Sequence, residues 1–168
     1  KILIQKDIQE DINFDEFETI EKLTIVIDKE GFLKSYKDHL PIDQIKKNQK
    51  NVNDIFHIQS NQKLLIFVSS GRVFTVNPNE LPSGKSNPKS YIYFIETESS
   101  EKLVGALVPE ENQNCLVISL NGKGFIADTS LLISNQKKGK KLFNLKNSDI
   151  LIKILIVDQK YIAITNKS

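Results

Sequence analysis

Three segments of this chain repeat one pattern: an apolar run typical of a β-strand, a tight turn built on glycine, and a second apolar run. The copies are LTIVIDKEGFLKSY from Leu23, KLLIFVSSGRVFTV from Lys63 and NCLVISLNGKGFIADT from Asn114, and a fourth, KYIAITNKS, starts at Lys160. The turn glycines are Gly31, Gly71 and Gly122. A period of roughly 40 to 50 residues with several strands per unit is typical of propeller blades. The repeat therefore predicts about three blades and the start of another. An array that ends inside a repeat is open, which predicts that the chain is part of a longer polypeptide.

Each unit is predicted to hold four strands, the usual number in a propeller blade. The hairpin supplies two, because each glycine turn joins two runs with the composition of antiparallel strands. A polar loop with lysines follows each hairpin, at residues 37–53, 79–90 and 134–141. A third strand is predicted near residues 54–56, 91–95 and 142–145, and a closing strand at residues 102–108 and 150–157. The sequence predicts an all-β, propeller-like fold.

Composition limits the class of protein. With 168 residues, of which 39% are apolar and 26% charged, the chain is long enough to bury the core of one globular domain. The longest apolar stretch, residues 150–157, contains Lys153 and is far shorter than a membrane span. The single Cys115 cannot form an internal disulfide, and the acidic N-terminus lacks the features of a signal peptide. These features predict a cytoplasmic protein without a membrane segment.

The net charge of +2 is distributed unevenly. Residues 1–22 hold seven acidic residues against three lysines, so the remainder of the chain is clearly basic. Its basic residues are all lysines except Arg72. Lysine is a hydrated point charge that suits phosphate contacts better than bidentate base recognition. Because the three lysine-containing loops occupy equivalent places in the repeat, we expect them to project from one rim and to follow the backbone of duplex DNA. The alternative is that the loops are polar only because they face water.

Several long segments resemble the C-terminal domain of the A subunit of bacterial type IIA topoisomerases, and topoisomerase IV above all. The segments are TIVIDKEGFLKSYKDHLPID (24–43), LLIFVSSGRVFTVNPNELPS (64–83), GKGFIADTSLL (122–132) and KKGKKLFNL (137–145). The resemblance implies a β-pinwheel, a disc of four-stranded blades that exchange strands with their neighbours. Residues 23–168 would form a partial pinwheel, and residues 1–22 would lead into it from the DNA-cleavage core.

The resemblance also implies that the basic perimeter of the disc binds and bends duplex DNA. The residues that would do so are all basic and lie on the predicted loops, turns and return strands. They are Lys34, Lys37, Lys46, Lys47, Lys50, Arg72, Lys85, Lys89, Lys123, Lys137, Lys138, Lys140 and Lys141.

One departure from the family separates its two branches. The gyrase A subunit carries a glycine- and arginine-rich box of the form QRRGGKG in its first blade, whereas the corresponding loop here is IKKNQKNVN, residues 45–53. Because that box accompanies chiral DNA wrapping in the family, its absence favours topoisomerase IV over gyrase.

What the resemblance implies for the whole enzyme is an ATP-dependent type II DNA topoisomerase that uses ATP and Mg²⁺. Its A subunit would be dimeric and would act with an ATP-binding B subunit on DNA in the bacterial cytoplasm, at the nucleoid. This chain would need no cofactor of its own. The tyrosine that attacks DNA lies in the cleavage core, a region that these residues do not resemble.

Other functional classes have less support in the residues. His39 and His57 lack a Cys or carboxylate at metal-ligand spacing, so no metal site is predicted. Cys115 opens a predicted strand and is expected to be a small buried residue and not a nucleophile. Two alternatives stay open: a propeller-type protein interaction scaffold, and a propeller enzyme that binds a sugar or another ligand. The second ranks last, because no paired carboxylates lie at comparable strand ends.

Overall fold

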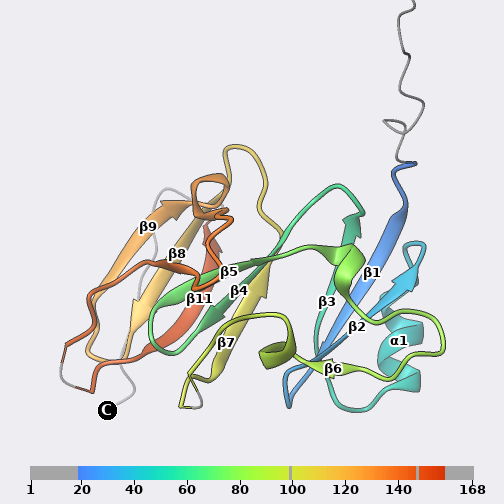
Figure 1. The fold of residues 1–168 in the computed structure, drawn as a ribbon, viewed down its shortest axis with the longest axis horizontal. Helices are drawn as coiled ribbons and strands as arrows, with labels where there is room; N and C mark the ends of the chain where they lie inside the picture. Colours follow the sequence, from blue (N-terminus) through green and yellow to red (C-terminus); the bar gives the residue numbers. More distant parts are fainter. Residues whose placement is uncertain (1–18, 99, 147, 158–168) are drawn as a thin grey trace, which may run out of the picture.

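Three small antiparallel sheets follow one another along the molecule (Figure 1). The structure is a computed structural model, and it describes residues 19–98, 100–146 and 148–157. Most of the predicted segment 1–22 and the predicted fourth unit from Lys160 lie outside these residues. No helix in the described ranges is long and apolar enough to cross a membrane.

Sheet 1 has the strand order β3-β1-β2-β6 and is built from β1 (Lys22–Asp28), β2 (Phe32–Lys37), β3 (Val52–Gln59) and β6 (Lys89–Ser90). Sheet 2 has the order β10-β5-β4-β7 and is built from β4 (Leu64–Val68), β5 (Arg72–Val76), β7 (Leu103–Leu107) and β10 (Lys140–Lys141). Sheet 3, with the order β11-β8-β9, is built from β8 (Asn114–Ser119), β9 (Gly124–Asp128) and β11 (Leu151–Val157). The three predicted hairpins and the closing strands are confirmed.

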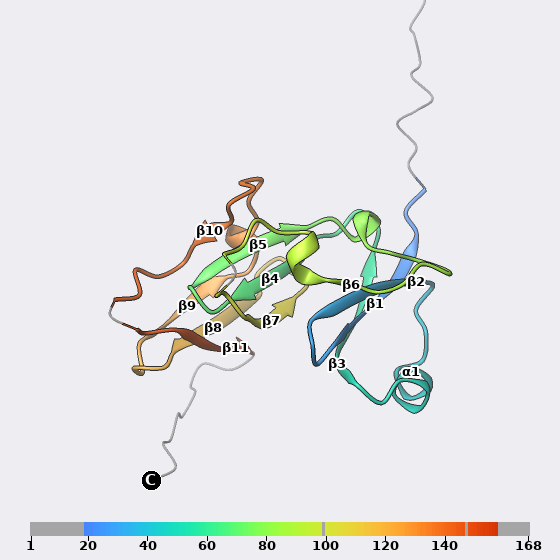
Figure 2. The ribbon, with the colours of Figure 1, turned by 60° about the horizontal axis from the view of Figure 1, so that its bottom comes forward.

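The outer strand of each four-stranded sheet comes from the next unit of the chain. After β5 of sheet 2, residues 77–90 cross to sheet 1, where β6 pairs with β2; after β9 of sheet 3, residues 129–141 cross to sheet 2, where β10 pairs with β5. We call these segments the first and second crossovers, and Figure 2 shows both. The strand exchange implied by the resemblance is therefore present.

Two predicted strands are wrong. Residues 91–95 begin with the 3₁₀ helix η3 (Tyr91–Tyr93), and residues 142–145 form no strand. In both places the chain has just left a crossover and bonds to a hairpin turn, with Tyr91 N donating to Gly31 O and Leu142 N donating to Gly71 O, each at 2.8 Å. A backbone group committed to a turn is not available for a strand ladder.

The predicted loop at residues 37–53 contains the helix α1 (Ile42–Asn48). Pro41 precedes it, Asp43 lies in its first turn and lysines lie in its last, which is the charge order that a helix dipole favours. Leu40 N donates to Thr24 Oγ1, on the face of β1 opposite to Leu23 and Ile25. The helix therefore belongs to the face of sheet 1 that is turned away from sheet 2. Two further 3₁₀ helices lie in the crossovers: η2 (Pro78–Glu80) and η4 (Ser130–Leu132).

The core consists of two apolar layers that share β4. Ile66 belongs to the layer between sheets 1 and 2, whereas Leu65 and Phe67 belong to the layer between sheets 2 and 3. All five residues of β4 are fully buried. This explains the continuous apolar run in the sequence, because a strand covered on both faces needs no polar residue at alternate positions.

Two of the hairpin glycines lie against side chains that directly follow the crossovers. Gly31 and Gly71 have φ of 84° and 81°, and a Cβ at Gly31 would lie 2.7 Å from Tyr91 Cδ1. At Gly71 a Cβ would lie 3.1 Å from Leu145 Cδ1. Gly122 has a similar φ of 76°, but no atom of the described residues lies within 4 Å of its Cβ position. Glycine is thus required at the first two turns both by backbone conformation and by packing.

We expect Gly31→Ala to destabilise the fold more than Gly122→Ala. Both substitutions place alanine at positive φ, which costs about 1–2 kcal/mol, but only the first must also displace the Tyr91 ring. Urea unfolding of the two variants measures the difference. Equal losses would mean that the docking of Tyr91 over the turn contributes nothing.

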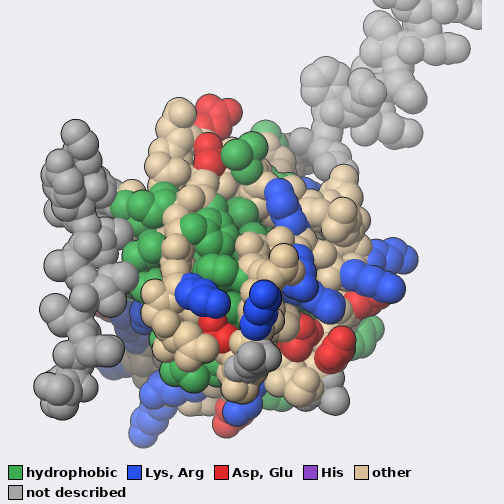
Figure 3. Space-filling model, turned by 90° about the vertical axis from the view of Figure 1, so that its left-hand side faces the viewer, with side chains coloured by type: hydrophobic (Ala, Val, Ile, Leu, Met, Phe, Trp, Pro, Cys, Tyr) green, Lys and Arg blue, Asp and Glu red, His purple; other side chains and the backbone are tan. Residues whose placement is uncertain are grey.

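Sheet 3 differs from the other two on its outer side. Among the described residues, β9 has no partner on its free edge and no helix equivalent to α1 covers the sheet. Leu116 of β8 lies in register with Ile126 and Leu155 on the face opposite to the core layer, and Ile126 is 58% exposed. Hydrophobic side chains gather on this side of the molecule (Figure 3). The exposed apolar residues of sheet 3 and its connections are Leu120, Ile126, Leu131, Ile133, Ile150, Ile152, Leu155 and Ile156.

Candidate nucleic-acid interface

The predicted basic residues fall into groups that belong to particular sheets. Seven surround the β2 side of sheet 1: Lys34 and Lys37 on β2, Lys46, Lys47 and Lys50 on or just after α1, and Lys85 and Lys89 on the first crossover. Five surround the β5 side of sheet 2: Arg72 on β5, and Lys137, Lys138, Lys140 and Lys141 on the second crossover. Lys123 alone belongs to sheet 3, in the turn between β8 and β9.

The three lysine-containing loops are not equivalent, which corrects the prediction of three matching positions. The two crossovers are equivalent, since each carries lysines to the outer edge of the preceding sheet. The first loop instead folds back on its own sheet as α1, where Gln49 Nε2 donates to Tyr36 OH of β2 at 2.7 Å. The crossovers form two steps of a repeated basic edge, and the helix adds a separate basic surface beside the first step.

Two of the lysines on sheet 1 lie against aromatic rings. Lys34 Nζ lies 5.3 Å from the centroid of the Tyr36 ring, and Lys89 Nζ lies 3.9 Å from the centroid of the Tyr93 ring. Such a cation–π contact holds the stem of the lysine in place and leaves ammonium protons free for an anion. Lys37 Nζ is 3.6 Å from Glu21 Oε1, but both side chains are largely exposed, so this pair is weak.

Arg72 is engaged within the protein. Its NH2 atom lies 3.8 Å from Glu98 Oε1 and its Nε atom lies 3.9 Å from Glu101 Oε1. Burial of Glu101 disfavours its charged form, but hydrogen bonds from Thr97 and from Glu98 N, together with the Arg72 charge, hold the pKa of Glu101 below its ordinary value. The Glu101 carboxylate therefore stays ionised at neutral pH and balances Arg72, which leaves the cations of this group to the lysines.

The second crossover is held in place by backbone contacts. Lys140 Nζ donates to Leu131 O at 2.7 Å, and Arg72 NH1 donates to Lys138 O at 3.4 Å. Lys137, Lys138 and Lys141 are exposed. A fixed backbone with free lysine side chains is suited to contact with phosphates, because the charges are placed without loss of their solvation in the free protein.

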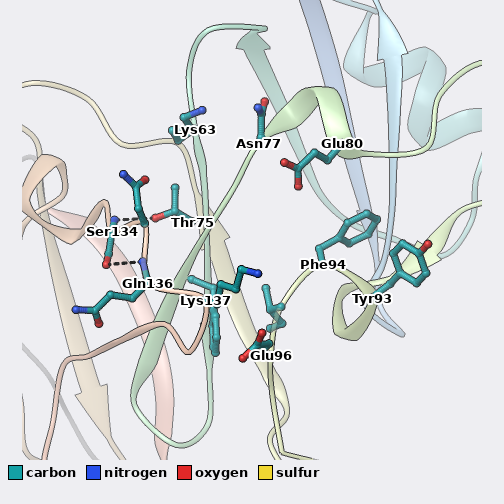
Figure 4. Close-up of a pocket in the computed structure, with 13 residues that line it drawn as sticks. Lys63, Thr75, Asn77, Glu80, Tyr93, Phe94, Glu96, Ser134, Gln136 and Lys137 are labelled. Carbon is teal, nitrogen blue, oxygen red and sulfur yellow. Dashed lines mark hydrogen bonds between the residues drawn. The ribbon is translucent and has the colours of Figure 1, made fainter.

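A groove of about 530 Å³ separates the two crossovers (Figure 4). Lys63 of the β3–β4 connection and Lys137 line it together with Glu80, Glu96 and Phe94. Lys63 is absent from the predicted set, because it precedes β4 and lies outside every lysine-rich loop. Its place in the repeat, just before the first strand of the unit, offers no signal that it faces the second crossover.

His39 and His57 stack on each other, with ring centroids 4.7 Å apart and an interplanar angle of 10°. His57 Nε2 donates to Leu40 O at 2.8 Å, and His39 Nε2 lies 3.3 Å from Ile58 O. These contacts connect the segment before α1 to β3, and they give both rings a structural role.

Cys115 is fully buried in the layer between sheets 2 and 3, as the sequence predicts. Burial, with a contribution from the charge of Asp128, raises the pKa of its thiol to about 11. Because the thiolate is the reactive form, we expect the native protein to resist iodoacetamide at pH 8 and the urea-unfolded protein to be alkylated readily. Mass spectrometry of the two samples measures the difference, and equal labelling would mean that sheet 3 opens frequently.

Comparison with known proteins gives this geometry a context. The A subunit of DNA topoisomerase 4 from Rickettsia conorii is 28% identical over 154 residues, which cover 90% of this chain. The protein of the same name from Escherichia coli K12 is 27% identical over 143 residues, or 82% of the chain. The resemblance to topoisomerase IV A subunits is confirmed. The chain spans about a fifth of the length of these relatives, 21% and 19%.

The gyrase branch is also similar, and solved structures share the fold. The A subunit of DNA gyrase from Fibrobacter succinogenes is 30% identical over 172 residues, covering 88% of this chain and 18% of the relative. The E. coli ParC C-terminal domain superposes with a TM-score of 0.72 at 24% identity, over 83% of this chain and 58% of that domain. A C-terminal domain of DNA topoisomerase IV gives 0.69 at 17% identity, over 84% and 47%. The fold is thus the propeller-like β-pinwheel. No protein-family model matches the chain.

Proposed function

We propose that this chain is a DNA-binding and DNA-bending part of a topoisomerase IV A subunit that presents duplex segments for strand passage and decatenation. The observation that carries the proposal is the repeated edge made by the two crossovers, in a chain similar to topoisomerase IV A subunits over 90% of its length. The fold itself fixes the spacing of lysines at equivalent places on successive sheets. Because a duplex presents about one phosphate charge per 1.7 Å of its axis, such a row of lysines can meet phosphates along the DNA backbone.

The proposed contacts are lysine to phosphate, without recognition of sequence. The basic groups on sheets 1 and 2 would bind the DNA backbone. Because the two groups belong to successive sheets, a duplex that contacts both would bend along the edge. Arg72 would support the second crossover and would not bind DNA directly, because two carboxylates lie beside it. The whole enzyme would use ATP and Mg²⁺, would work at the nucleoid in the cytoplasm and would act with an ATP-binding B subunit.

The choice of topoisomerase IV over gyrase rests on the first-blade loop. Residues 45–53 contain neither glycine nor arginine, and the first part of this segment is the end of helix α1. The gyrase A subunit remains the alternative, since a gyrase relative is 30% identical.

A second candidate function is a protein interaction scaffold. The exposed apolar residues of sheet 3, among them Ile126 and Leu155, favour it, because contiguous apolar surface marks protein contacts more often than DNA contacts. A scaffold of this kind would bind its partner with little dependence on salt.

Salt-titrated binding to a duplex of about 40 base pairs tests the proposal. We expect the logarithm of the affinity to fall steeply and linearly with the logarithm of the salt concentration, with the same slope for unrelated sequences, because each phosphate contact releases counterions. Absence of binding at low salt would remove the DNA role from this chain and leave the scaffold function.

A further inference from the structure

Two large apolar side chains are exposed directly after the first crossover. Ile92 is 52% exposed and Tyr93 is 70% exposed, and both lie on the short helix η3 directly after β6. We call this pair the apolar tip. Isolated exposed apolar residues are common on protein surfaces, but two consecutive ones on a single turn, outside the apolar face of sheet 3, call for an explanation.

The tip is held on a rigid base. The preceding residue, Tyr91, is buried; its ring covers Gly31 and its hydroxyl donates to Glu101 O at 2.8 Å. Phe94 N donates to Tyr91 O at 3.0 Å, and Ile95 is buried in the layer between sheets 1 and 2. The residues on both sides of the tip are thus fixed to the core, so little conformational entropy is lost when the tip makes a contact.

The tip lies next to a cation that belongs to the basic edge. Lys89 Nζ lies 3.9 Å from the centroid of the Tyr93 ring, and the ring also packs edge-to-face on Phe94 at 5.4 Å. Tyr93 and Phe94 both line the groove between the crossovers, and in Figure 4 Tyr93 lies farther from Lys137 than Phe94 does. β6 is the outermost strand of sheet 1, so Lys89 and Tyr93 share the border of the sheet.

An apolar pair beside a phosphate-binding lysine matches the surface of a DNA minor groove. There the phosphates line both walls, and apolar side chains that enter between them insert at a base step, partly unstack it and bend the duplex. A protein partner would also accept an apolar tip, but it would not require the neighbouring ammonium group. The Lys89 contact therefore favours DNA.

We propose that the apolar tip, Ile92 and Tyr93, enters the minor groove of the bound duplex while Lys89 contacts an adjacent phosphate. This inference rests on the DNA-binding function proposed above, and it adds contacts that do not depend on charge. It predicts two kinds of variant: loss of the tip weakens binding equally at every salt concentration, whereas loss of Lys89 changes the salt dependence.

The first experiment compares two variants of the full 168-residue chain in the salt titration. For Ile92→Ala/Tyr93→Ala we expect about a tenfold loss of affinity with an unchanged slope, since burial of two apolar side chains is worth at least that factor. For Lys89→Ala we expect a slope that is shallower by about 0.9. Ile126→Ala is the matched control, because Ile126 is 58% exposed on β9 of sheet 3, outside the basic groups on sheets 1 and 2. Unchanged affinity of the tip variant, in a parent that binds DNA, overturns the inference and leaves the proposed function intact; a parent that does not bind overturns both.

The second experiment locates the tip on the DNA. The chain has no tryptophan, so Tyr93→Trp introduces a single fluorescent reporter, with Ile126→Trp on sheet 3 as the control. We expect a duplex to quench the Trp at position 93 and to leave the fluorescence of the Trp at position 126 unchanged. We also expect netropsin, which fills the minor groove of A·T-rich duplexes, to prevent the quenching. Quenching that persists on a netropsin-saturated duplex would place the tip elsewhere and overturn the minor-groove assignment.

Discussion

Phe67→Ala is expected to lower the free energy of unfolding by about 3–5 kcal/mol, the usual loss for a buried phenylalanine. Phe67 is fully buried on β4, the strand shared by both core layers, where it lies opposite Val73 and Gly105. Since a domain of this size is stable by only about 5–15 kcal/mol, this one ring accounts for a large share of the free energy of unfolding. Chemical unfolding followed by circular dichroism measures the loss.

Phe32→Ala is the matched control for this substitution. Phe32 is 39% exposed at the start of β2, so the same change of side chain should cost far less there. If the two variants lost similar stability, the layer between sheets 2 and 3 would not be a tightly packed core.

Removal of four lysines from the second crossover should weaken DNA binding by about two to four orders of magnitude near 0.1 M salt, because each lost phosphate contact makes the salt dependence shallower by about 0.9, or nearly one order of magnitude of affinity between 1 M and 0.1 M salt. The variant is Lys137→Ala/Lys138→Ala/Lys140→Ala/Lys141→Ala. Lys140 also donates to Leu131 O, so the thermal midpoint of the variant must be recorded beside its affinity. Fluorescence anisotropy with a labelled duplex measures both affinity and slope.

A control with the same change of charge separates position from net charge. Lys29, Lys102, Lys146 and Lys153 are exposed and lie outside the predicted set. Their quadruple alanine variant should retain most of the affinity of the parent. Equal losses in the two quadruple variants would show that the crossover is not the binding edge and that only the total charge matters.

Local chemistry explains what could be predicted about the fold. The hairpins at Gly31, Gly71 and Gly122 follow from turn residues that act over two or three positions, and all three glycines have the positive φ that such turns need. The continuous run in β4 likewise indicates burial on both faces. The helix α1 also has local signals, Pro41 and Asp43 before two lysines, although the segment is predicted above only as a polar loop.

Contacts over long distances explain what could not be predicted. Residues 91–95 have the composition of a strand, and they form a turn because Tyr91 bonds to Gly31, sixty positions earlier in the chain. For the same reason the exposure of Tyr93 has no sequence signature. In the candidate interface, the lysine clusters can be read directly from the sequence. The pairing of the Arg72 charge with Glu98 and Glu101 cannot, because it depends on how β5 packs against the segment before β7.

The crossovers also determine the order in which the fold can be completed during synthesis. The outer strand β6 can pair with sheet 1 only after the ribosome has released Lys89, and the Tyr91 ring can pack on Gly31 only after Tyr91 has emerged. By then the hairpin of sheet 2 has already emerged, and sheet 2 in turn waits for Lys140 and Leu145. Each sheet therefore matures one repeat late, so the nascent chain always carries one unfinished sheet near the ribosome, the stage at which unpaired strand edges are most prone to aggregate.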